Sequence, residues 1–193
     1  MEHNNGTERY SFKNRYTAIA CVNKSMAIGR DGKLLYHINA DLSNFKSMTD
    51  GNVVIMGRKT FESLPGLKPL KGRVNIVITS KENYVVDGAD DEEFCDTYVC
   101  SSLEDADSLC YAFFGDRQLF IIGGESIYRQ AIDAGIVDEV RLTVVNDDAE
   151  GDAHFPDIES DVNYKRVFRT SSLRDYSNDN DLYYRYVFFR KVA

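Results

Sequence analysis

The feature that most constrains the fold is a regular alternation between short runs rich in β-branched residues and longer amphipathic runs. Strand-like runs that alternate with helical runs are typical of a largely parallel sheet with helices on both faces. We therefore expect a three-layer α/β fold. The strand-like runs cover 16–22, 52–56, 73–79, 97–100, 119–122 and 137–145, and the helical runs lie in the 40s, near Thr60, and at 103–114 and 127–134.

The two ends of the chain differ from this pattern. Segments 164–170 and 182–190 are both strand-like, and the polar loop between them has no helical pattern. Consecutive strands without a helix between them pair antiparallel, so we expect a C-terminal antiparallel hairpin. Residues 1–15 are polar and lack a capped helical pattern, which predicts a disordered tail followed by one domain over 16–193.

Charge and cysteine usage narrow the class of protein. The formal net charge is −8, which argues against a surface that binds nucleic acid or an anionic membrane. No apolar run approaches the roughly 20 residues that cross a bilayer. The three histidines are scattered, and the cysteines show neither CxxC pairing nor zinc-finger spacing. We expect a cytoplasmic protein without a metal site, with reduced thiols at Cys21, Cys95, Cys100 and Cys110.

Asp41 is the residue that points most directly to chemistry. It lies in segment 38–46, where Leu42 and Phe45 recur at helical spacing, so its carboxylate neighbours the apolar face of a short helix. Such an acid has two interpretations. Asn39 or Asp41 could cap the helix by accepting hydrogen bonds from first-turn amides. Alternatively, the carboxylate is a reactive group placed against a buried surface, and this segment alone does not distinguish the two.

Two turns from strand to helix have features of anion sites. After 52–56, a glycine leads into 57–60, where two cations and a threonine occupy the first helical turn. Cations there oppose the helix dipole, which favours phosphate binding over a purely stabilising role. After 119–122, Gly123 and Gly124 lack the third glycine of the dinucleotide fingerprint, so that motif is excluded. Both turns follow strands, where ligands bind in α/β sheets.

Segment 27–36 follows the first strand and contains Gly29 and Gly32 but few packing residues. It is either an ordinary connection or a lid that closes over a substrate and excludes water. Acidic segments 87–96 and 146–152 are interpreted as solvated loops.

Taken in order, these elements resemble dihydrofolate reductase over residues 16–191. The resemblance implies an eight-stranded sheet with helices on both faces. It also implies reduction of 7,8-dihydrofolate to tetrahydrofolate by NADPH, antifolate-type ligands and a monomeric state. The matching stretches are 20–22 with 27–29, 41–46, 54–64, 121–124 and 150–156.

The resemblance gives the substrate residues their roles. Asp41 would be the sole ionisable group at the pterin, supported by the hydroxyl of Thr143. Arg73 would grip the α-carboxylate of the glutamate tail through its guanidinium fork, with Lys68 assisting. Ile19 would offer its backbone carbonyl to the pterin. The implied catalytic set is Asp41, Tyr36 and Thr143, and the implied substrate set is Ile19, Asp41, Phe45, Leu64, Lys68, Arg73 and Thr143.

The resemblance also gives a cofactor site. Residues 58–60 with Thr79 and Ser80 would hold the phosphates of NADPH, and the Gly123–Gly124 pair matches one that is joined in the family by a cis peptide. The implied cofactor residues are Cys21, Ile28, Gly29, Gly57, Arg58, Lys59, Thr60, Thr79, Ser80, Ile122, Gly123, Gly124, Glu125, Ser126, Ile127 and Tyr128.

The chain departs from the family pattern at two places. Leu35 and Tyr36 stand where the family usually has Pro-Trp. The family pattern therefore does not predict how water is arranged here or how fast the lid closes. Ser126 stands where many members have an arginine for the 2′-phosphate, which leaves that task to Arg58.

Two other functions fit parts of the sequence. The pyrimidine reductase of riboflavin synthesis shares the fold and cofactor, but not a pterin site that combines Asp41, Phe45 and Arg73. A module that only binds folate or NADPH would gain nothing from a lid over a hydride donor.

Overall fold

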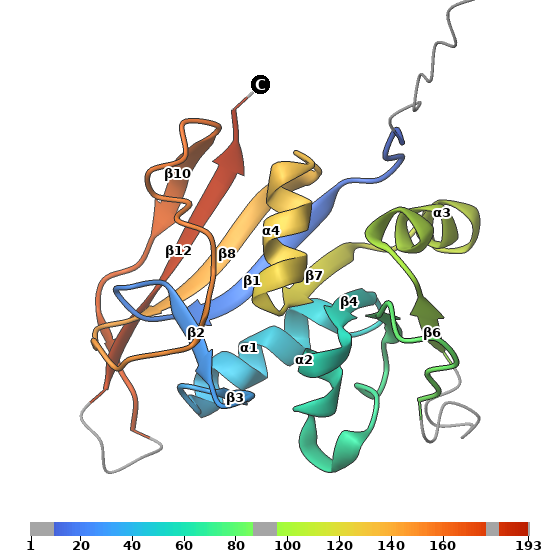
Figure 1. The fold of residues 1–193 in the computed structure, drawn as a ribbon. Coiled ribbons are helices and arrows are strands. Elements are labelled where there is room, and N and C mark those ends of the chain that lie inside the picture. The colour runs from blue at the N-terminus through green and yellow to red at the C-terminus, as the bar shows by residue number, and fades with distance from the viewer. Residues whose placement is uncertain (1–9, 87–95, 177–181, 193) are drawn as a thin grey trace, which may run out of the picture.

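The computed structural model describes residues 10–86, 96–176 and 182–192. A central sheet in the order β10-β12-β8-β1-β7-β4-β5-β6 runs through the molecule (Figure 1). Neighbouring strands from β8 to β6 are parallel, as the alternating pattern predicted. These strands are β1 (Tyr16–Val22), β4 (Val53–Gly57), β5 (Val74–Ile78), β6 (Thr97–Cys100), β7 (Leu119–Gly123) and β8 (Val137–Val145).

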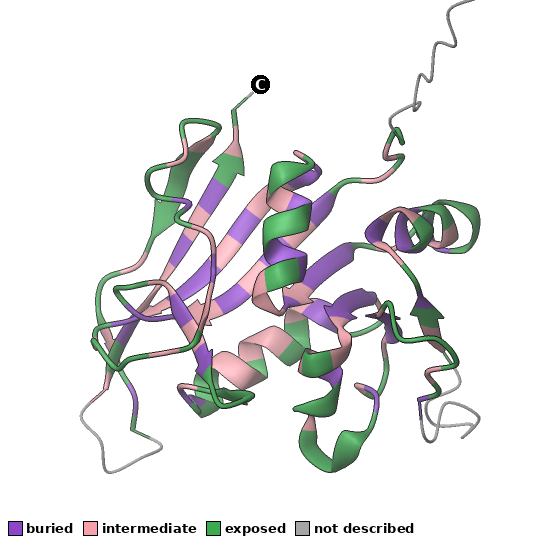
Figure 2. Cartoon of the chain, viewed as in Figure 1, coloured by how far each residue is buried: buried purple, intermediate pink, exposed green. Residues whose placement is uncertain are grey.

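Helices cover both faces of the sheet, which confirms the three-layer prediction. Helices α3 (Leu103–Phe113) and α4 (Glu125–Asp133) pack on the face that carries Ala18 and Ala20. Phe61 of α2 (Arg58–Glu62) packs on the opposite face, and α1 (Asn39–Thr49) precedes β4 in the chain. The central strands are buried on both sides, while the outer faces of α3 and α4 are exposed (Figure 2). The predicted bounds of these elements agree with the structure to within two residues.

The C-terminal hairpin is present as predicted, and it extends the sheet beyond β8. Strand β12 (Tyr183–Lys191) lies between β8 and β10 (Tyr164–Arg169) and is antiparallel to both. A two-residue strand, β11 (Leu173–Arg174), pairs with the start of β12. The sheet thus has eight main strands, with β11 as a short addition at its edge.

The segment predicted as a loop or lid contains a small antiparallel sheet. Its order is β3 (Lys33–Leu34), β2 (Ala27–Arg30) and β9 (Ala153–His154). Gly151 permits this arrangement, because a Cβ there would lie 2.7 Å from the Gly29 carbonyl oxygen and 2.8 Å from the Ala27 Cβ. The lid segment is therefore attached to the chain around β9.

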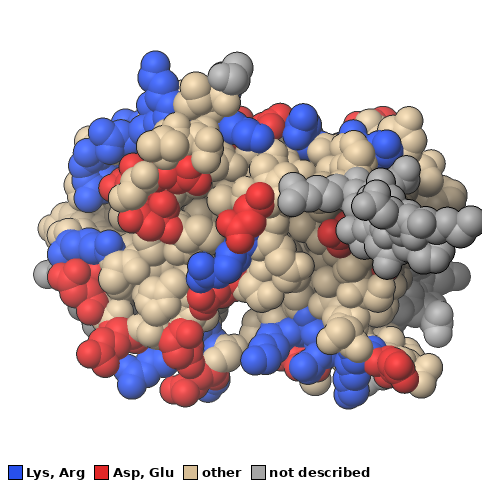
Figure 3. Space-filling view, turned by 45° about the horizontal axis from the view of Figure 1, so that its top comes forward, with Lys and Arg blue, Asp and Glu red and all other residues tan. Residues whose placement is uncertain are grey.

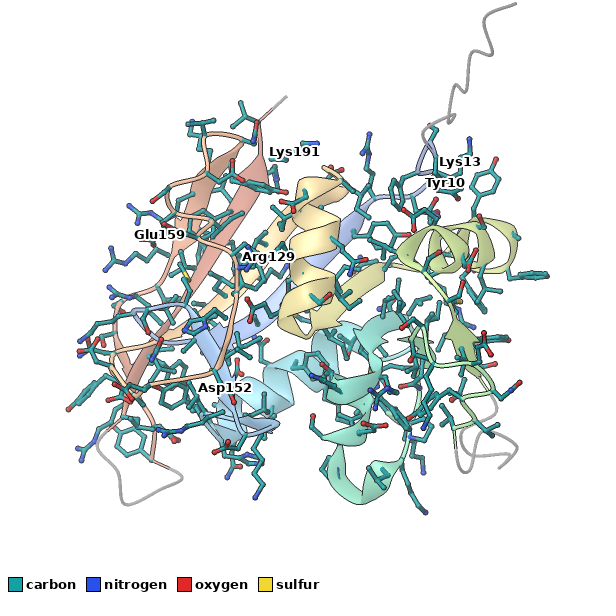
Figure 4. The ribbon with its side chains drawn as sticks, in the orientation of Figure 1. Tyr10, Lys13, Arg129, Asp152, Glu159 and Lys191 are labelled. Carbon is teal, nitrogen blue, oxygen red and sulfur yellow. The ribbon has the colours of Figure 1, made fainter. Side chains whose placement is uncertain are left out.

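The segment just before β1 differs from the predicted disordered tail. Residues 1–9 lie outside the described residues, but Tyr10 and Lys13 lie against α3 (Figure 4). The carboxylate of Asp107, which is fully buried in α3, accepts five hydrogen bonds from this part of the chain. The donors are Tyr10 Oη, Lys13 N, Asn14 N, Asn14 Nδ2 and Tyr16 Oη. Sequence periodicity could not find this contact, because its partners are about ninety residues apart.

Two further observations bear on the predicted class. In the described part of the chain, no helix is long and apolar enough to cross a membrane. Within the same residues, no group of three or more His, Cys, Asp or Glu side chains is placed to hold a metal ion. Cys21, Cys100 and Cys110 are free thiols, and Cys95 lies outside the described residues.

Candidate active site

A cavity of about 1000 Å³ opens at the carboxyl ends of the parallel strands. It is lined by the residues that directly follow β4, β5, β6 and β7, together with β2, β3 and the start of α4. Parallel strands end at the same sheet edge, so the turns after them meet there. All sixteen residues implied as cofactor-binding, from Cys21 to Tyr128, line this one cavity.

The backbone comes unusually close to neighbouring groups at the base of this cavity. Gly123 has φ +121°, and a Cβ there would lie 3.2 Å from the Tyr128 ring. A Cβ on Gly124 would lie 3.1 Å from Thr60 Oγ1. The Gly123–Gly124 peptide bond is cis, as the resemblance implied. The glycines thus keep open a backbone-lined cradle, which is the shape a pyrophosphate requires.

Helix α4 presents its N-terminus to the same cavity. Its N-cap residue is Gly124, which gives no side-chain hydrogen bond, so the first-turn amides have no side-chain cap. Glu125 lies in that turn and accepts hydrogen bonds from His154 N (3.0 Å) and Arg129 Nη2 (2.9 Å). These bonds lower the pKa of Glu125, His154 first among them.

One of the two cations expected at the phosphates, Arg58, has an acidic partner within the chain. Arg58 Nη1 lies 2.8 Å and 2.7 Å from the two carboxylate oxygens of Glu62, one helical turn away. Ser126 accepts a hydrogen bond from Gln130 Nε2 at 2.9 Å. Lys59 is exposed at the cavity wall. A phosphate that binds Arg58 must therefore share the guanidinium with Glu62 or displace the Glu62 carboxylate from it.

Asp41 is not among the residues that line this cavity, and it is not a helix cap. The N-cap of α1 is Ile38, and it makes no side-chain cap hydrogen bond. The Asp41 carboxylate instead accepts a hydrogen bond from the hydroxyl of Thr143 on β8. Thr143 is paired across the sheet with Cys21, which lines the cavity. The alternative that made Asp41 a cap is therefore excluded, and its carboxylate neighbours the cofactor cavity.

The surroundings of Asp41 disfavour its charged form. Burial raises the pKa of Asp41, and the hydrogen bond from Thr143 offsets part of that rise. The neighbouring phenol of Tyr186 has its pKa raised to about 12, first by burial and further by nearby groups that include Asp41. A half-buried carboxyl with a raised pKa beside a large cavity is a recognised mark of a functional site.

The other implied substrate residues are spread over several elements and do not line the large cavity. Arg73 lies with its Cζ 5.9 Å from the Phe45 ring centroid and donates to Thr49 Oγ1 at 3.3 Å. Ile19 and Leu64 pack in the same hydrophobic cluster. Lys68 is exposed just after the 3₁₀ turn η1 (Pro65–Leu67).

Ile19 and Tyr36 have hydrogen-bond partners that the sequence did not suggest. The Ile19 carbonyl, expected at the pterin, accepts a hydrogen bond from Tyr128 Oη at 2.6 Å. The Tyr36 hydroxyl donates to Asp147 Oδ2 at 2.8 Å, and the side chain is buried. Burial and that carboxylate raise the pKa of Tyr36 to about 12. Tyr36 thus fixes the end of the lid segment to the β8–β9 connection.

The cavity also includes residues that sequence reasoning missed. Ser101 and Ser102 follow β6 at the same edge as the other turns, so the rule on strand ends could have found them. Asp152 accepts a hydrogen bond from Asp31 N at 2.9 Å and so fixes the lid (Figure 4). Arg129 comes from the second turn of α4. The additional lining residues are Ala20, Arg30, Gly32, Lys33, Leu34, Ser63, Ile78, Ser101, Ser102, Arg129, Gln130, Asp133, Asp152 and Ala153.

Comparisons with known proteins agree with this arrangement. The sequence profile of the family described as dihydrofolate reductase matches residues 15–191. Dihydrofolate reductase of Bacillus subtilis (strain 168) is 35% identical over 173 residues, which cover 90% of this chain and 92% of that protein. The enzyme of Neisseria meningitidis serogroup A is 40% identical over 156 residues, which cover 81% and 87%.

A solved structure gives the same result for the fold. Dihydrofolate reductase from Enterococcus faecalis, complexed with NADP(H) and RAB-propyl, superposes with a TM-score of 0.77 at 27% identity. The match covers 94% of this chain and 99% of that structure. The extent of these matches, together with the cavity and the Asp41–Thr143 pair, shows that the chain belongs to the dihydrofolate reductase family.

Proposed function

We propose that this protein reduces 7,8-dihydrofolate to tetrahydrofolate with NADPH. The observation that carries the proposal is the half-buried carboxylate of Asp41, held by Thr143 one strand away from the cavity residue Cys21. A single ionisable group placed next to a dinucleotide-sized cavity suits a reaction in which hydride and proton reach neighbouring atoms of one ring.

The residues around the cavity fit NADPH. Backbone amides at the start of α4 and the glycine cradle suit the pyrophosphate, because oriented N–H groups and the helix dipole favour an anion. Hydroxyls at Thr60, Thr79 and Ser80 and the cations Arg58 and Lys59 supply further donors. When bound, NADPH supplies the hydride that C6 of the pterin receives.

Asp41 would orient and polarise the pterin by accepting hydrogen bonds from its 2-amino group and N3. A carboxylate held by Thr143 is fixed in direction, so these bonds can form without reorganising the site. We infer that Asp41 does not protonate N5 itself, and that a water admitted beside the 27–36 segment does so. Tyr36 would act as a positioning residue, since its hydroxyl ties that segment to Asp147.

Arg73 would bind the α-carboxylate of the substrate's glutamate tail. Phe45 lies against its guanidinium and Thr49 accepts one of its N–H groups, which limits its rotamers but leaves other N–H donors for a carboxylate. The tail would then lie beside α1 and outside the cofactor cavity.

The preference for NADPH over NADH would rest on Arg58. Ser126 offers no charge at the position where the family often has an arginine, whereas Arg58 lines the cavity and is paired with Glu62. An exposed i,i+4 ion pair is screened by solvent and contributes little to stability. A phosphate can therefore recruit Arg58 at little cost.

The test follows the loss of NADPH absorbance after dihydrofolate is added to the purified protein, with product identity checked chromatographically. We expect rapid oxidation that yields tetrahydrofolate and is slower with NADH. Arg58→Gln should weaken NADPH binding more than NADH binding, and the matched control Arg117→Gln should leave both unchanged. Tight NADPH binding without oxidation by dihydrofolate would overturn the proposal and direct attention to a pyrimidine substrate or to a binding function.

A further inference from the structure

A second, smaller pocket lies on the β10–β12–β8 part of the sheet, away from the active site. It has a volume of about 200 Å³ and is bordered by the turn after β1 and by the β9–β10 connection. Figure 4 shows Glu159 on that connection, beside β10. The pocket is lined by Asn23, Lys24, Met26, Val144, Glu159, Arg166, Arg169, Arg185 and Val187.

The charge of this pocket is opposite to that of the whole protein. Its lining contains four cations and one carboxylate, a formal charge of +3, whereas the chain carries −8. On the face shown in Figure 3, acidic and basic side chains are mixed, with a group of Lys and Arg at one upper edge. This local excess of positive charge in a small concavity favours an anionic ligand, although the protein as a whole is acidic.

Strand register brings these cations together on one face of the sheet. Arg169 lies opposite Val187 on β12, and Arg185 lies two residues before Val187, so the two arginines are diagonal neighbours. Val144 lies directly across from Arg185 on β8. Like charges on neighbouring strands repel, which opposes folding when nothing neutralises them. The valines form an apolar floor, and the guanidinium groups border it.

The carboxylates near this pocket neutralise only part of its charge. Lys24 Nζ lies 2.9 Å from Asp148, so that cation has a partner outside the pocket. Arg166 Nη1 lies 4.0 Å from Glu159 Oε1, which is a weak contact. Among the residues that the structure describes, no carboxylate lies within 4.0 Å of Arg169 or Arg185.

The volume of this pocket and its hydrogen-bond donors indicate the kind of ligand that it can bind. The volume is several times the roughly 30 Å³ that one water occupies, but lies below the roughly 300 Å³ at which drug-sized pockets begin. Guanidinium forks that approach from different strands match an anion with several oxygens in different directions, whereas a single carboxylate engages one fork. We propose that this pocket is a binding site for a small phosphate-type dianion, either inorganic phosphate or a short phosphate ester.

The first experiment titrates inorganic phosphate, and separately glycerol phosphate, into the full-length protein at constant ionic strength, by calorimetry. NADPH is present in saturating amount, so that the active-site cavity does not bind the probe. We expect saturable binding of at least one probe, and the stronger one identifies the source. Absence of saturable heat from both probes would overturn the proposal.

The second experiment locates the binding. Arg169→Gln combined with Arg185→Gln should weaken binding at least tenfold, while Glu159→Gln should strengthen it. The matched control combines Lys165→Gln with Arg190→Gln, which removes two cations from the same strands outside the pocket and should leave binding unchanged. Equal weakening in the control would mean that only overall charge attracts the anion, and unchanged binding in the Arg169/Arg185 variant would mean that the anion binds elsewhere. Either result contradicts the proposal.

Discussion

Asp107 and Asp41 have opposite electrostatic surroundings. Asp107 accepts five hydrogen bonds and is fully buried, whereas Asp41 is half-buried and its one hydrogen bond recorded among the described residues comes from Thr143. Burial alone would raise the pKa of Asp107, but hydrogen bonds from Lys13, Tyr16, Asn14 and Tyr10 hold it below its usual range. The pKa of Asp41 is raised.

For Asp107 the hydrogen-bond donors outweigh the effect of burial on the pKa, whereas for Asp41 the single donor does not. Hydrogen bonds to the charged form stabilise it and fix the surrounding chain, so Asp107 anchors the segment before β1 to α3. A carboxylate with few donors remains poised to interact with a ligand, which is what Asp41 requires. We therefore expect substitutions of Asp41 to change turnover and substitutions of Asp107 to change stability.

The largest expected effect is on turnover. Asp41→Asn should lower kcat for dihydrofolate by about 100-fold or more, the usual contribution of a positioned acid–base group. Affinity for NADPH should change less than about twofold, because Asp41 lies outside the cavity lining. Steady-state kinetics and fluorescence titration measure both quantities. A variant with undiminished turnover at neutral pH would refute the role assigned to Asp41.

Asp107→Asn should show the reverse behaviour. An amide nitrogen would be placed among five donors, and a buried unsatisfied group costs about 1–3 kcal/mol of unfolding free energy. Turnover at 25 °C should remain close to that of the wild type. Urea unfolding measures the loss, and Asp116→Asn, an exposed site after α3, is the matched control. A large loss of turnover with unchanged stability would make Asp107 part of the active site.

Thr143→Val should reveal the link between the hydroxyl and Asp41. The hydrogen bond lowers the pKa of Asp41, so its removal raises that pKa further and moves the acidic limb of kcat/KM to higher pH. At neutral pH we expect kcat/KM to fall roughly three- to tenfold, in keeping with the loss of a hydrogen bond worth about 1 kcal/mol. Thr17→Val is the control on another strand. An unmoved limb would mean that Thr143 only fills space.

The smallest expected effect is a difference in how stability depends on pH. Asp107 has a lowered pKa in the folded state, so its contribution is present above the ordinary aspartate pKa and is lost as pH falls through the folded value. The gap in unfolding free energy between wild type and Asp107→Asn should therefore narrow on acidification below about pH 4. For Asp41 the pH dependence has the opposite sign. Its pKa is raised because the folded state disfavours the charged form, so its contribution to stability is lost as pH rises through the folded pKa. If the unfolding free energies of Asp41→Asn and Asp107→Asn changed with pH in parallel, the proposed difference between the two aspartates would be contradicted.

Part of the cofactor cavity was predictable from sequence, because the turns after β4, β5 and β7 meet at one edge of the sheet. The full set of sixteen cofactor residues came from the resemblance, and all of them line the cavity. The substrate side was harder, since Asp41, Arg73 and Thr143 come from three separate elements. The resemblance named these residues and implied the contact between Asp41 and Thr143, which the structure contains, but only packing shows that Tyr36 donates to Asp147.

The features missed by sequence reasoning depend on contacts between distant segments. The strands of the small sheet are two to four residues long, too short to show a period, and they form because Gly151 allows β9 to approach β2. The ordered segment before β1 depends on a single buried acid in α3. Neither signal exists within a local window of sequence.

The most direct test of this account is a ¹³C NMR titration of the Asp41 and Asp107 carboxyl groups, assigned with the two asparagine variants. We predict that Asp41 titrates above the ordinary aspartate range and that Asp107 titrates below it. Asp41 titrating at or below the position of Asp107 would contradict the division between a reactive carboxylate and an anchoring one.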